Sequence, residues 1–257
     1  MIDIIYYKNF YFFTIIVPLV LGGRTEHIMK HVVITGADRG IGFALAEIYV
    51  KNGYTVYAGQ FMPDWPQLNE LKEQYPDTLF IIPMNVGNDA SVKNAAKMVA
   101  ELTDTVDILV NCAGIFPPAD DRANYAKTFQ VNALGAVRVI DCFLPLMKNG
   151  DKRICTISSE AGIIALCSRD DRFVYCQSKA ALNIALQMFF NKLRPEGYTF
   201  RVYHPGWVRS YMSGTKSTEG NFEPEEAAQI AYEQFTGDTV SEDVLLMQDV
   251  YNQYWPF

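Results

Sequence analysis

Short apolar runs alternate with amphipathic segments along most of the chain. Each run has four to six residues rich in Val, Ile, Leu and Tyr, as buried strands do, and the segments between the runs carry apolar residues at helical spacing. The runs predict strands at residues 31–35, 54–58, 79–84, 107–111, 153–157, 200–204 and 244–247. The intervening segments predict helices at residues 43–51, 67–75, 89–102, 124–147, 175–193 and 224–235. This alternation predicts a single α/β domain, with a doubly wound, seven-stranded parallel sheet and helices on both faces.

Residues 1–28 do not share this alternation. The run from Phe10 to Leu21 is apolar over about a dozen residues, fewer than the roughly 20 that a membrane-spanning helix needs. No small-residue cleavage site follows it, as a secretory signal would require. Because Met29 stands directly before the first strand, we interpret 1–28 as an N-terminal extension and 29–257 as the domain. The extension is dispensable, packs on a neighbouring subunit or anchors the chain to a membrane.

Composition narrows the classes of partner. With 49% hydrophobic and 20% charged residues, a chain of 257 residues can bury a full core. A net charge of −7 and the lack of any basic run argue against a nucleic-acid partner, and membrane association is not expected. The five cysteines are an odd number without metal-ligand spacing, so we interpret them as reduced thiols of a cytoplasmic protein without a metal site.

A glycine-rich turn follows the first predicted strand and precedes the first predicted helix. Its glycines are Gly36, Gly40 and Gly42. In this setting glycines let the backbone approach a pyrophosphate, while the helix N-terminus supplies N–H donors and the positive end of a dipole. The turn therefore predicts a dinucleotide site.

The end of the second predicted strand bears on the choice of dinucleotide. An acidic residue there would bond the ribose 2′-hydroxyl and repel a 2′-phosphate. This chain has Gln60 near that position, and Arg39 in the glycine turn is placed to pair with a phosphate. We therefore expect NADP(H) to be favoured over NAD(H), with NAD(H) still possible.

A tyrosine and a lysine mark the predicted catalytic helix. Tyr175 and Lys179 are four residues apart and so share one helix face, and Ser159 lies sixteen residues before the tyrosine. An ammonium beside a phenol favours the phenolate, which lowers the tyrosine pKa toward the range useful for proton transfer. The arrangement predicts an acid–base site at Tyr175.

Five ordered motifs resemble those of one family, the classical short-chain dehydrogenases/reductases, and the resemblance covers essentially all of residues 29–257. Within that family the chain looks like the bacterial branch near the C-factor and carbonyl-reductase-like members. The resemblance implies a single-domain Rossmann fold. The motifs are Thr35-Gly36-x-x-x-Gly40-x-Gly42, Asn111-Cys-Ala-Gly114, Asn132, Ser159 with Tyr175-x-x-x-Lys179, and Pro205-Gly206-x-Val208-x-Ser210.

The resemblance also implies residue roles. Tyr175 would transfer the proton, and Lys179 would lower its pKa and hold the nicotinamide ribose. Ser159 would bond the substrate oxygen, and Asn132 would hold a water in a proton relay from Lys179. The residues expected to bind the cofactor are Gly36, Asp38, Arg39, Gly40, Ile41, Gly42, Gln60, Asn85, Val86, Asn111, Ala113, Gly114, Tyr175, Lys179, Pro205, Gly206, Val208 and Ser210.

The chain departs from the family pattern in places. Asn85 stands where an aspartate is usual, and Ser210 replaces a threonine. The spacing from Ser159 to Tyr175 is longer than is common in the family, with the surplus around residues 167–173. The charges of that segment indicate a solvated loop, although Arg169 or Arg172 could read an acidic substrate. Residues 209–222 are polar and contain glycine, which is typical of a mobile substrate loop.

We therefore expect an oxidoreductase that interconverts a secondary alcohol and a ketone or aldehyde. The aromatic residues Phe116, Phe173, Trp207 and Tyr211 favour a hydrophobic carbonyl, such as a steroid, a retinoid or an acyl compound. The resemblance implies a homodimer or homotetramer. The alternative is a non-catalytic dinucleotide-binding protein that senses redox state or binds a partner. The complete set of catalytic residues argues against that alternative.

Overall fold

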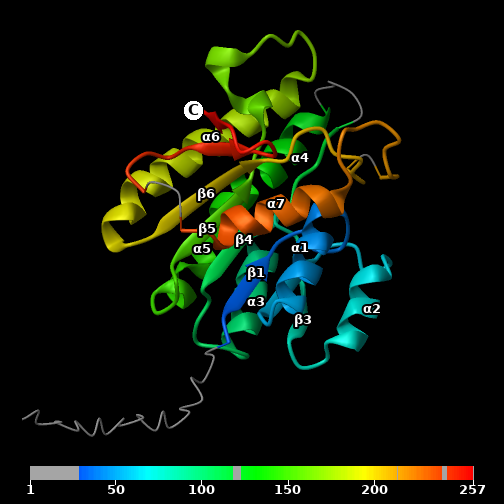
Figure 1. Ribbon diagram of the computed structural model, residues 1–257, viewed down its shortest axis with the longest axis vertical. Helices are drawn as coiled ribbons and strands as arrows, with labels where there is room; N and C mark the ends of the chain where they lie inside the picture. Colours follow the sequence, from blue (N-terminus) through cyan, green and yellow to red (C-terminus); the bar gives the residue numbers. More distant parts are fainter. Residues whose placement is uncertain (1–28, 118–122, 213, 239–241, 257) are drawn as a thin grey trace, which may run out of the picture.

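The structure is a computed structural model that describes residues 29–117, 123–212, 214–238 and 242–256. The predicted extension, residues 1–28, lies outside the described residues. Figure 1 shows the described chain as one twisted sheet with helices packed on both of its faces.

The sheet has eight strands among the described residues, in the order β3-β2-β1-β4-β5-β6-β7-β8. All neighbouring pairs are parallel except β7 and β8. The predicted doubly wound, parallel arrangement is thus confirmed, with one more strand than expected. The strands are β1 (His31–Ile34), β2 (Thr55–Gln60), β3 (Leu79–Pro83), β4 (Ile108–Asn111), β5 (Arg153–Ile157), β6 (Thr199–His204), β7 (Met247–Asp249) and β8 (Tyr254–Trp255).

The extra strand arises from a tight reversal after β7. The carboxylate of Asp249 accepts hydrogen bonds from the backbone N–H groups of Tyr251 and Gln253, each at 2.8 Å. Its other oxygen accepts from the indole nitrogen of Trp255 at 2.9 Å. These bonds hold β8 antiparallel to β7. The last predicted strand, residues 244–247, is also displaced, because β7 begins at Met247.

Two apolar layers join the helices to the sheet. One lies between the strands and α1 (Gly40–Lys51), α2 (Gln67–Gln74) and α7 (Pro224–Thr236). The other lies beneath α3 (Asp89–Ala100), α5 (Leu134–Met147) and α6 (Phe173–Leu193). Successive side chains of β1 point to opposite faces of the sheet and so enter both layers. Val32 and Ile34 enter the first layer, and Val33 enters the second. Three short 3₁₀ helices complete the description, η1 (Glu160–Gly162), η2 (Ile164–Leu166) and η3 (Arg194–Glu196).

The helix predicted over residues 124–147 is divided in two. α4 (Ala123–Asn132) ends where Ala133 adopts φ −107° and ψ −66°, and α5 follows directly. The whole stretch from Ala123 to Met147 is long and apolar enough to cross a membrane by length and composition. In this fold, however, Val139, Ile140 and Phe143 are fully buried in the protein core. Burial in the protein covers 33% of the most apolar window of this stretch, so packing on the sheet accounts for part of its apolar character.

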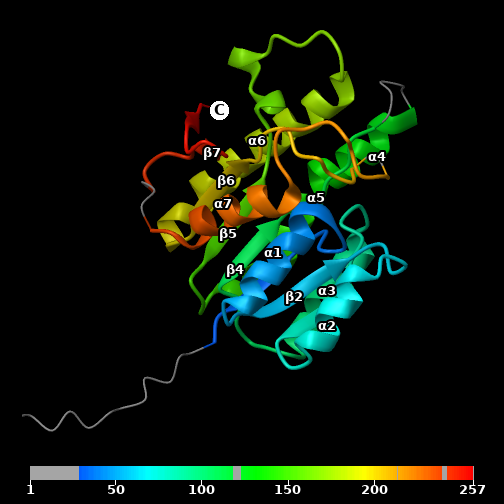
Figure 2. The ribbon, with the colours of Figure 1, turned by 45° about the vertical axis from the view of Figure 1, so that its right-hand side comes forward.

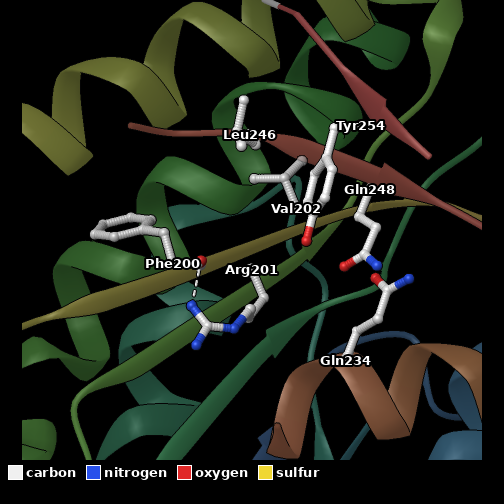
Figure 3. Close-up of a pocket in the computed structure, with 7 residues that line it drawn as sticks. All are labelled: Phe200, Arg201, Val202, Gln234, Leu246, Gln248 and Tyr254. Atoms are coloured by element: carbon white, nitrogen blue, oxygen red, sulfur yellow. Dashed lines mark hydrogen bonds between the residues drawn. The ribbon is translucent and has the colours of Figure 1, made fainter. Parts of the chain in front are cut away.

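A small cavity lies between β6, β7, β8 and α7 (Figure 3). Figure 3 shows Arg201, Gln234, Gln248 and Tyr254 around it. Its volume of about 10 Å³ suffices for roughly one water molecule. It is too small for a substrate. In open parallel sheets of this kind, ligands bind at the carboxyl ends of the strands.

Candidate active site

The glycine turn after β1 needs its glycines for close backbone contacts. Gly36 has φ +65°, and a Cβ there would lie 2.9 Å from the Cα of Ala113. A Cβ on Gly42 would lie 2.1 Å from the carbonyl oxygen of Gly36. Such contacts exclude any side chain, so the turn brings the N-terminus of α1 directly against the ends of β1 and β4.

The N-terminus of α1 is open to an anion. The backbone N–H groups of Gly40, Ile41 and Gly42 have no acceptor among the described residues. Unpaired N–H groups and the positive dipole end of a helix together favour a phosphate. The predicted pyrophosphate site therefore has the donors it requires.

Thr35 ties the ends of β1 and β4 together. Its hydroxyl oxygen accepts hydrogen bonds from the backbone N–H groups of Cys112 and Ala113, each at 3.0 Å. The residue is 1% exposed, so no water can replace it in these bonds. Thr35 thus fixes the spacing between two of the predicted cofactor segments.

We expect Thr35→Val to lower the free energy of unfolding by about 1–3 kcal/mol, because two buried N–H groups lose their acceptor. Urea unfolding measures this change, and Thr35→Ser, which keeps the oxygen, is the matched control. A valine variant as stable as the serine variant would show that this hydroxyl does not hold the strand ends.

Two buried amides at the carboxyl edge lack partners. The side-chain nitrogen and oxygen of Asn111, and the side-chain nitrogen of Gln60, have no hydrogen-bond partner among the described residues. An unpaired buried polar group costs about 1–3 kcal/mol, which a bound polar ligand would recover. Both residues were predicted to bind the cofactor, and their unpaired atoms fit an elongated polar ligand along this edge.

Arg39 lies beside an aromatic residue that the sequence did not single out. Its guanidinium is 5.0 Å from the centre of the Trp65 ring, and Tyr211 packs edge-on against the same ring at 5.3 Å. The neighbouring Asp38 accepts a hydrogen bond from the backbone N–H of Phe61 at 2.7 Å. Burial raises the pKa of Asp38 above its ordinary value. Arg39 thus supplies a cation beside the glycine turn.

The remaining residues predicted at the adenosine end have local partners. The side-chain oxygen of Asn85 accepts from the backbone N–H of Gly87 at 2.9 Å, and its backbone N–H donates to Ser91 at 2.9 Å. Val86 is buried and lies close to Gly135 of α5. These contacts fix the turn after β3.

Tyr175 and Lys179 lie on the same face of α6, as predicted. The Lys179 nitrogen is 6.0 Å from the centre of the Tyr175 ring and donates to the carbonyl of Ile157 at 3.1 Å. Phe116 packs edge-on against Tyr175 at 4.7 Å. Figure 2 shows α6 on one face of the sheet beside β6, and the bond from Lys179 to Ile157 places the start of the helix at the end of β5. The helix therefore delivers both groups to the carboxyl edge of the sheet.

Burial dominates the pKa values of this pair. It raises the pKa of Tyr175 to about 12, with Ser159 and Arg169 acting in the opposite direction. It lowers the pKa of Lys179 to about 8. The predicted lowering of the Tyr175 pKa by Lys179 is therefore not what governs the ligand-free site, because desolvation of the phenol outweighs the neighbouring charges.

Asn132 anchors the segment after β4. Its side-chain oxygen accepts from the backbone N–H of Ile115 at 2.8 Å, and its nitrogen donates to the Ile115 carbonyl at 2.9 Å and to Ser178 at 3.0 Å. Ser178 in turn donates to the carbonyl of Tyr175 at 2.8 Å. Asn132 thereby joins α4 to the catalytic helix, and its role in a water relay stays a prediction.

Ser159 lies beside the carboxylate of Glu160. Its hydroxyl donates to Glu160 at 2.7 Å and accepts from the backbone N–H of Ala161 at 3.2 Å. Glu160 also forms an ion pair with Arg169 and lies 3.3 Å from the Nε2 of His204. Arg169 is therefore engaged within the protein, and Arg172 lies 5.0 Å from the centre of the Phe116 ring.

The segment after β6 forms a loop that is tied at its base. Gly206 has φ +70°, Val208 forms a bridge with Phe222, and Ser210 accepts from the backbone N–H of Ser217 at 2.9 Å. Tyr211 lies near Gly40, within 3.9 Å of where a Cβ would stand. The predicted substrate loop therefore reaches across to the glycine turn.

Comparison with known proteins gives this site a context. The short chain dehydrogenase family matches residues 30–221. The chain is 30% identical over 203 residues to estradiol 17-beta-dehydrogenase 2 of Mus musculus, an alignment covering 76% of the chain and 52% of that protein. It is 38% identical over 122 residues to C-signal of Myxococcus xanthus, covering 45% of the chain and 74% of that protein. The chain thus spans about half the length of the mouse relative.

A solved structure agrees with the fold. The NADPH-bound carbonyl reductase from chicken fatty liver superposes with a TM-score of 0.77 at 24% identity, covering 89% of the chain and 99% of that protein. This likeness agrees with the predicted Rossmann fold, and the C-signal match supports the predicted resemblance to the C-factor branch. From the match over residues 30–221, which holds the glycine turn, Ser159, Tyr175 and Lys179, the chain belongs to the short-chain dehydrogenase family.

Proposed function

We propose that the chain is an NADP(H)-dependent oxidoreductase that interconverts a secondary alcohol and a ketone or aldehyde. The observation that carries the proposal is the assembly of Tyr175, Lys179 and Ser159 at the sheet edge that also holds the glycine turn. Because the chain spans only part of its mouse relative, this activity rests on the site and on membership of the family.

The residues present fit a nicotinamide dinucleotide. The free N–H groups at the start of α1 would hold the pyrophosphate, and the unpaired amides of Asn111 and Gln60 would pair with its polar groups. Arg39 has no ion-pair partner among the described residues and would take the 2′-phosphate of NADP(H). When bound, the cofactor supplies or accepts the hydride.

The chain's own residues handle the proton. Tyr175 would give its hydroxyl proton to the carbonyl oxygen in reduction and take the hydroxyl proton of the alcohol in oxidation. Ser159 would orient the substrate oxygen beside Tyr175. Lys179, whose ammonium is buried next to the tyrosine ring, would stabilise negative charge as it develops on the phenol oxygen.

A hydrophobic substrate is favoured by the surroundings of Tyr175. Phe116 packs on its ring, and Phe173 and Trp207 are 53% and 57% exposed on the neighbouring segments. Exposed aromatic side chains around a polar centre are suited to an apolar body that carries one carbonyl. Steroid, retinoid and acyl carbonyls all meet this description, and the mouse relative is named for a steroid.

The proposal is tested by the loss of NADPH absorbance, and separately of NADH absorbance, across a panel of hydrophobic and small carbonyls. Turnover with the hydrophobic members supports the proposal. Binding of a dinucleotide without turnover on the whole panel would favour the redox-sensor alternative. Failure to bind either dinucleotide would show that the cofactor site is assigned to the wrong residues.

Arg39→Ala is expected to weaken NADPH binding by about 10- to 100-fold, as the loss of a charged hydrogen bond predicts. Its affinity for NADH should remain within about twofold, because NADH has no 2′-phosphate. Titration calorimetry with both dinucleotides makes the NADH arm the internal control. An equal loss of affinity for both dinucleotides would show that Arg39 does not recognise the 2′-phosphate. The preference for NADP(H) would then have no support from this residue.

Association of two or four copies through α5 and α6 is part of the proposal. Ile184 and Met188 stand one turn apart on α6 and are 59% and 66% exposed, and Leu134 at the start of α5 is 43% exposed. Exposed apolar side chains on a helix face favour an interface. Sedimentation velocity of the purified chain measures the mass directly.

A further inference from the structure

Arg39 carries a positive charge that no neighbouring carboxylate neutralises. It directly precedes α1, and its guanidinium forms no ion pair within the part of the chain that the structure describes. The adjacent Asp38 is 6% exposed, and its carboxylate accepts instead from the backbone N–H of Phe61 at 2.7 Å. The charge of Arg39 is therefore available to an anionic ligand.

The indole ring of Trp65 stands against this guanidinium. The central carbon of the guanidinium is 5.0 Å from the centre of the ring. A cation within about 6 Å of an indole ring is attracted by the negative face of the ring. An arginine side chain has many rotamers, and holding it in one geometry costs conformational entropy. Trp65 therefore restricts the position of Arg39 before any ligand binds.

The loop between β2 and α2 holds Trp65 itself in place. Its indole N–H donates to the side-chain oxygen of Gln67 at 3.0 Å, and its backbone N–H donates to the carbonyl of Met62 at 3.2 Å. Pro63 and Pro66 flank this part of the loop and fix its φ angles. The ring is thus fixed by its own segment and does not depend on Arg39 for its position.

A residue of the substrate loop also supports the ring. Tyr211 packs edge-on against Trp65, with the ring centres 5.3 Å apart and the planes at 75°. Tyr211 also lies near Gly40, within 3.9 Å of where a Cβ would stand. Trp65 therefore joins three segments that are distant in sequence, which are the glycine turn, the loop after β2 and the segment after β6.

Contact with Trp65 leaves Arg39 able to bind a phosphate. A guanidinium that stacks on a ring uses its face, whereas its N–H donors lie in its plane and can form paired bonds to phosphate oxygens. The free N–H groups at the start of α1 provide for the pyrophosphate. Arg39 is accordingly available for a second, separate phosphate group beside the glycine turn.

We propose that Trp65 is a positioning residue that holds the Arg39 guanidinium ready for the 2′-phosphate of NADP(H), and that Tyr211 supports it from the substrate loop. The inference rests on the proposed function and adds to it an origin for the cofactor preference. Without the ring Arg39 keeps its charge, but the phosphate itself has to order the side chain, which lowers the affinity. A ligand that lacks the 2′-phosphate is unaffected, because the ring acts through Arg39.

The test uses adenosine 2′,5′-bisphosphate, which carries the 2′-phosphate, and adenosine 5′-monophosphate, which lacks it. Titration calorimetry on the full-length chain measures both affinities. Trp65→Ala should weaken the bisphosphate about 3- to 10-fold and change the monophosphate by less than about twofold. Trp65→Phe keeps an aromatic face and should recover part of the loss. Phe61→Ala removes a 58% exposed ring from the same loop and should change neither affinity.

A double-mutant cycle shows whether the ring acts through Arg39. In the Arg39→Ala chain, Trp65→Ala should cause no further loss of bisphosphate affinity. Tyr211→Ala should cause a smaller loss than Trp65→Ala, and none once Trp65 is removed. An equal loss for both nucleotides, or the same loss with and without Arg39, would overturn the proposal, since the ring would then support the cleft or touch the adenosine. Tighter binding by Trp65→Ala would also overturn it, because the ring would then hold Arg39 away from the phosphate.

These affinities need no turnover, which separates the inference from the proposed function. Coupled loss of bisphosphate affinity in a chain that turns over no carbonyl would sink the proposed function and leave the role of Trp65 intact. Turnover with NADPH in a chain whose bisphosphate affinity does not depend on Trp65 would overturn that role alone.

Discussion

Tyr175→Phe is expected to lower kcat by about 10²–10⁴-fold, because the phenol is the group that gives the carbonyl its proton. The fold should survive, since the phenylalanine ring can keep the edge-on contact that Tyr175 makes with Phe116 at 4.7 Å. NADPH oxidation with the best carbonyl of the panel measures the rate, and thermal unfolding measures the fold.

The control for this substitution is Tyr251→Phe, the same change at a residue that is 63% exposed and lies after β7. It should leave both rate and melting temperature unchanged. NADPH affinity should also be similar in the Tyr175 variant. If that variant kept a tenth or more of the normal rate, another group would have to supply the proton.

Lys179→Met should abolish turnover and at the same time stabilise the ligand-free chain at neutral pH. The ammonium is 5% exposed, and its only hydrogen bond among the described residues is to the carbonyl of Ile157. Burial lowers the pKa of Lys179 to about 8 from 10.5, so the folded state disfavours the charged form. Removing that charge should raise the free energy of unfolding by at most about 3.4 kcal/mol.

The pH dependence of this gain in the free energy of unfolding shows whether the buried charge of Lys179 causes it. Below pH 8 Lys179 is charged in both states, and the folded chain bears the full penalty. Between pH 8 and 10.5 the unfolded state binds the additional proton, so the wild-type chain becomes more stable as pH rises. The advantage of the methionine variant should therefore shrink across that window and vanish above it.

Melting temperatures from pH 6 to pH 11 measure the difference between the two chains. Lys148→Met, at the exposed end of α5, is the matched control and should show no such window. A Lys179 variant less stable than wild type at pH 7 would mean that the ammonium contributes to packing or bonding more than burial costs. Gain of stability with loss of rate is the expected signature of a group retained for function.

Local patterns were sufficient to predict most of the fold. Apolar runs indicate which residues are buried, and glycines indicate where the backbone turns. The strands of the parallel sheet were therefore predicted to within a few residues. The glycine turn was predictable for the same reason, because Gly42 lies against Gly36 within one strand–turn–helix unit and Gly36 adopts a positive φ. The placement of Tyr175 over Lys179 follows from helical geometry alone.

Contacts between distant segments were not predictable in this way. The pairing of Glu160 with Arg169 and His204 joins three elements, and nothing in the local sequence of any of them marks the partner. Trp65 lies against Arg39 only because the loop after β2 folds back over the glycine turn. Asn132, at the end of α4, bonds to Ile115, seventeen residues away.

The two borders of the sheet bear on how copies of the chain meet. At one border β3 ends in the exposed Pro83, which has no N–H to offer, and the Lys72 ammonium lies 4.7 Å from the centre of the Phe80 ring of the same strand. At the other border β8 is two residues long and is followed directly by Pro256. Among the described residues, neither border presents a continuous row of backbone donors and acceptors, so self-association by strand addition at these borders is disfavoured.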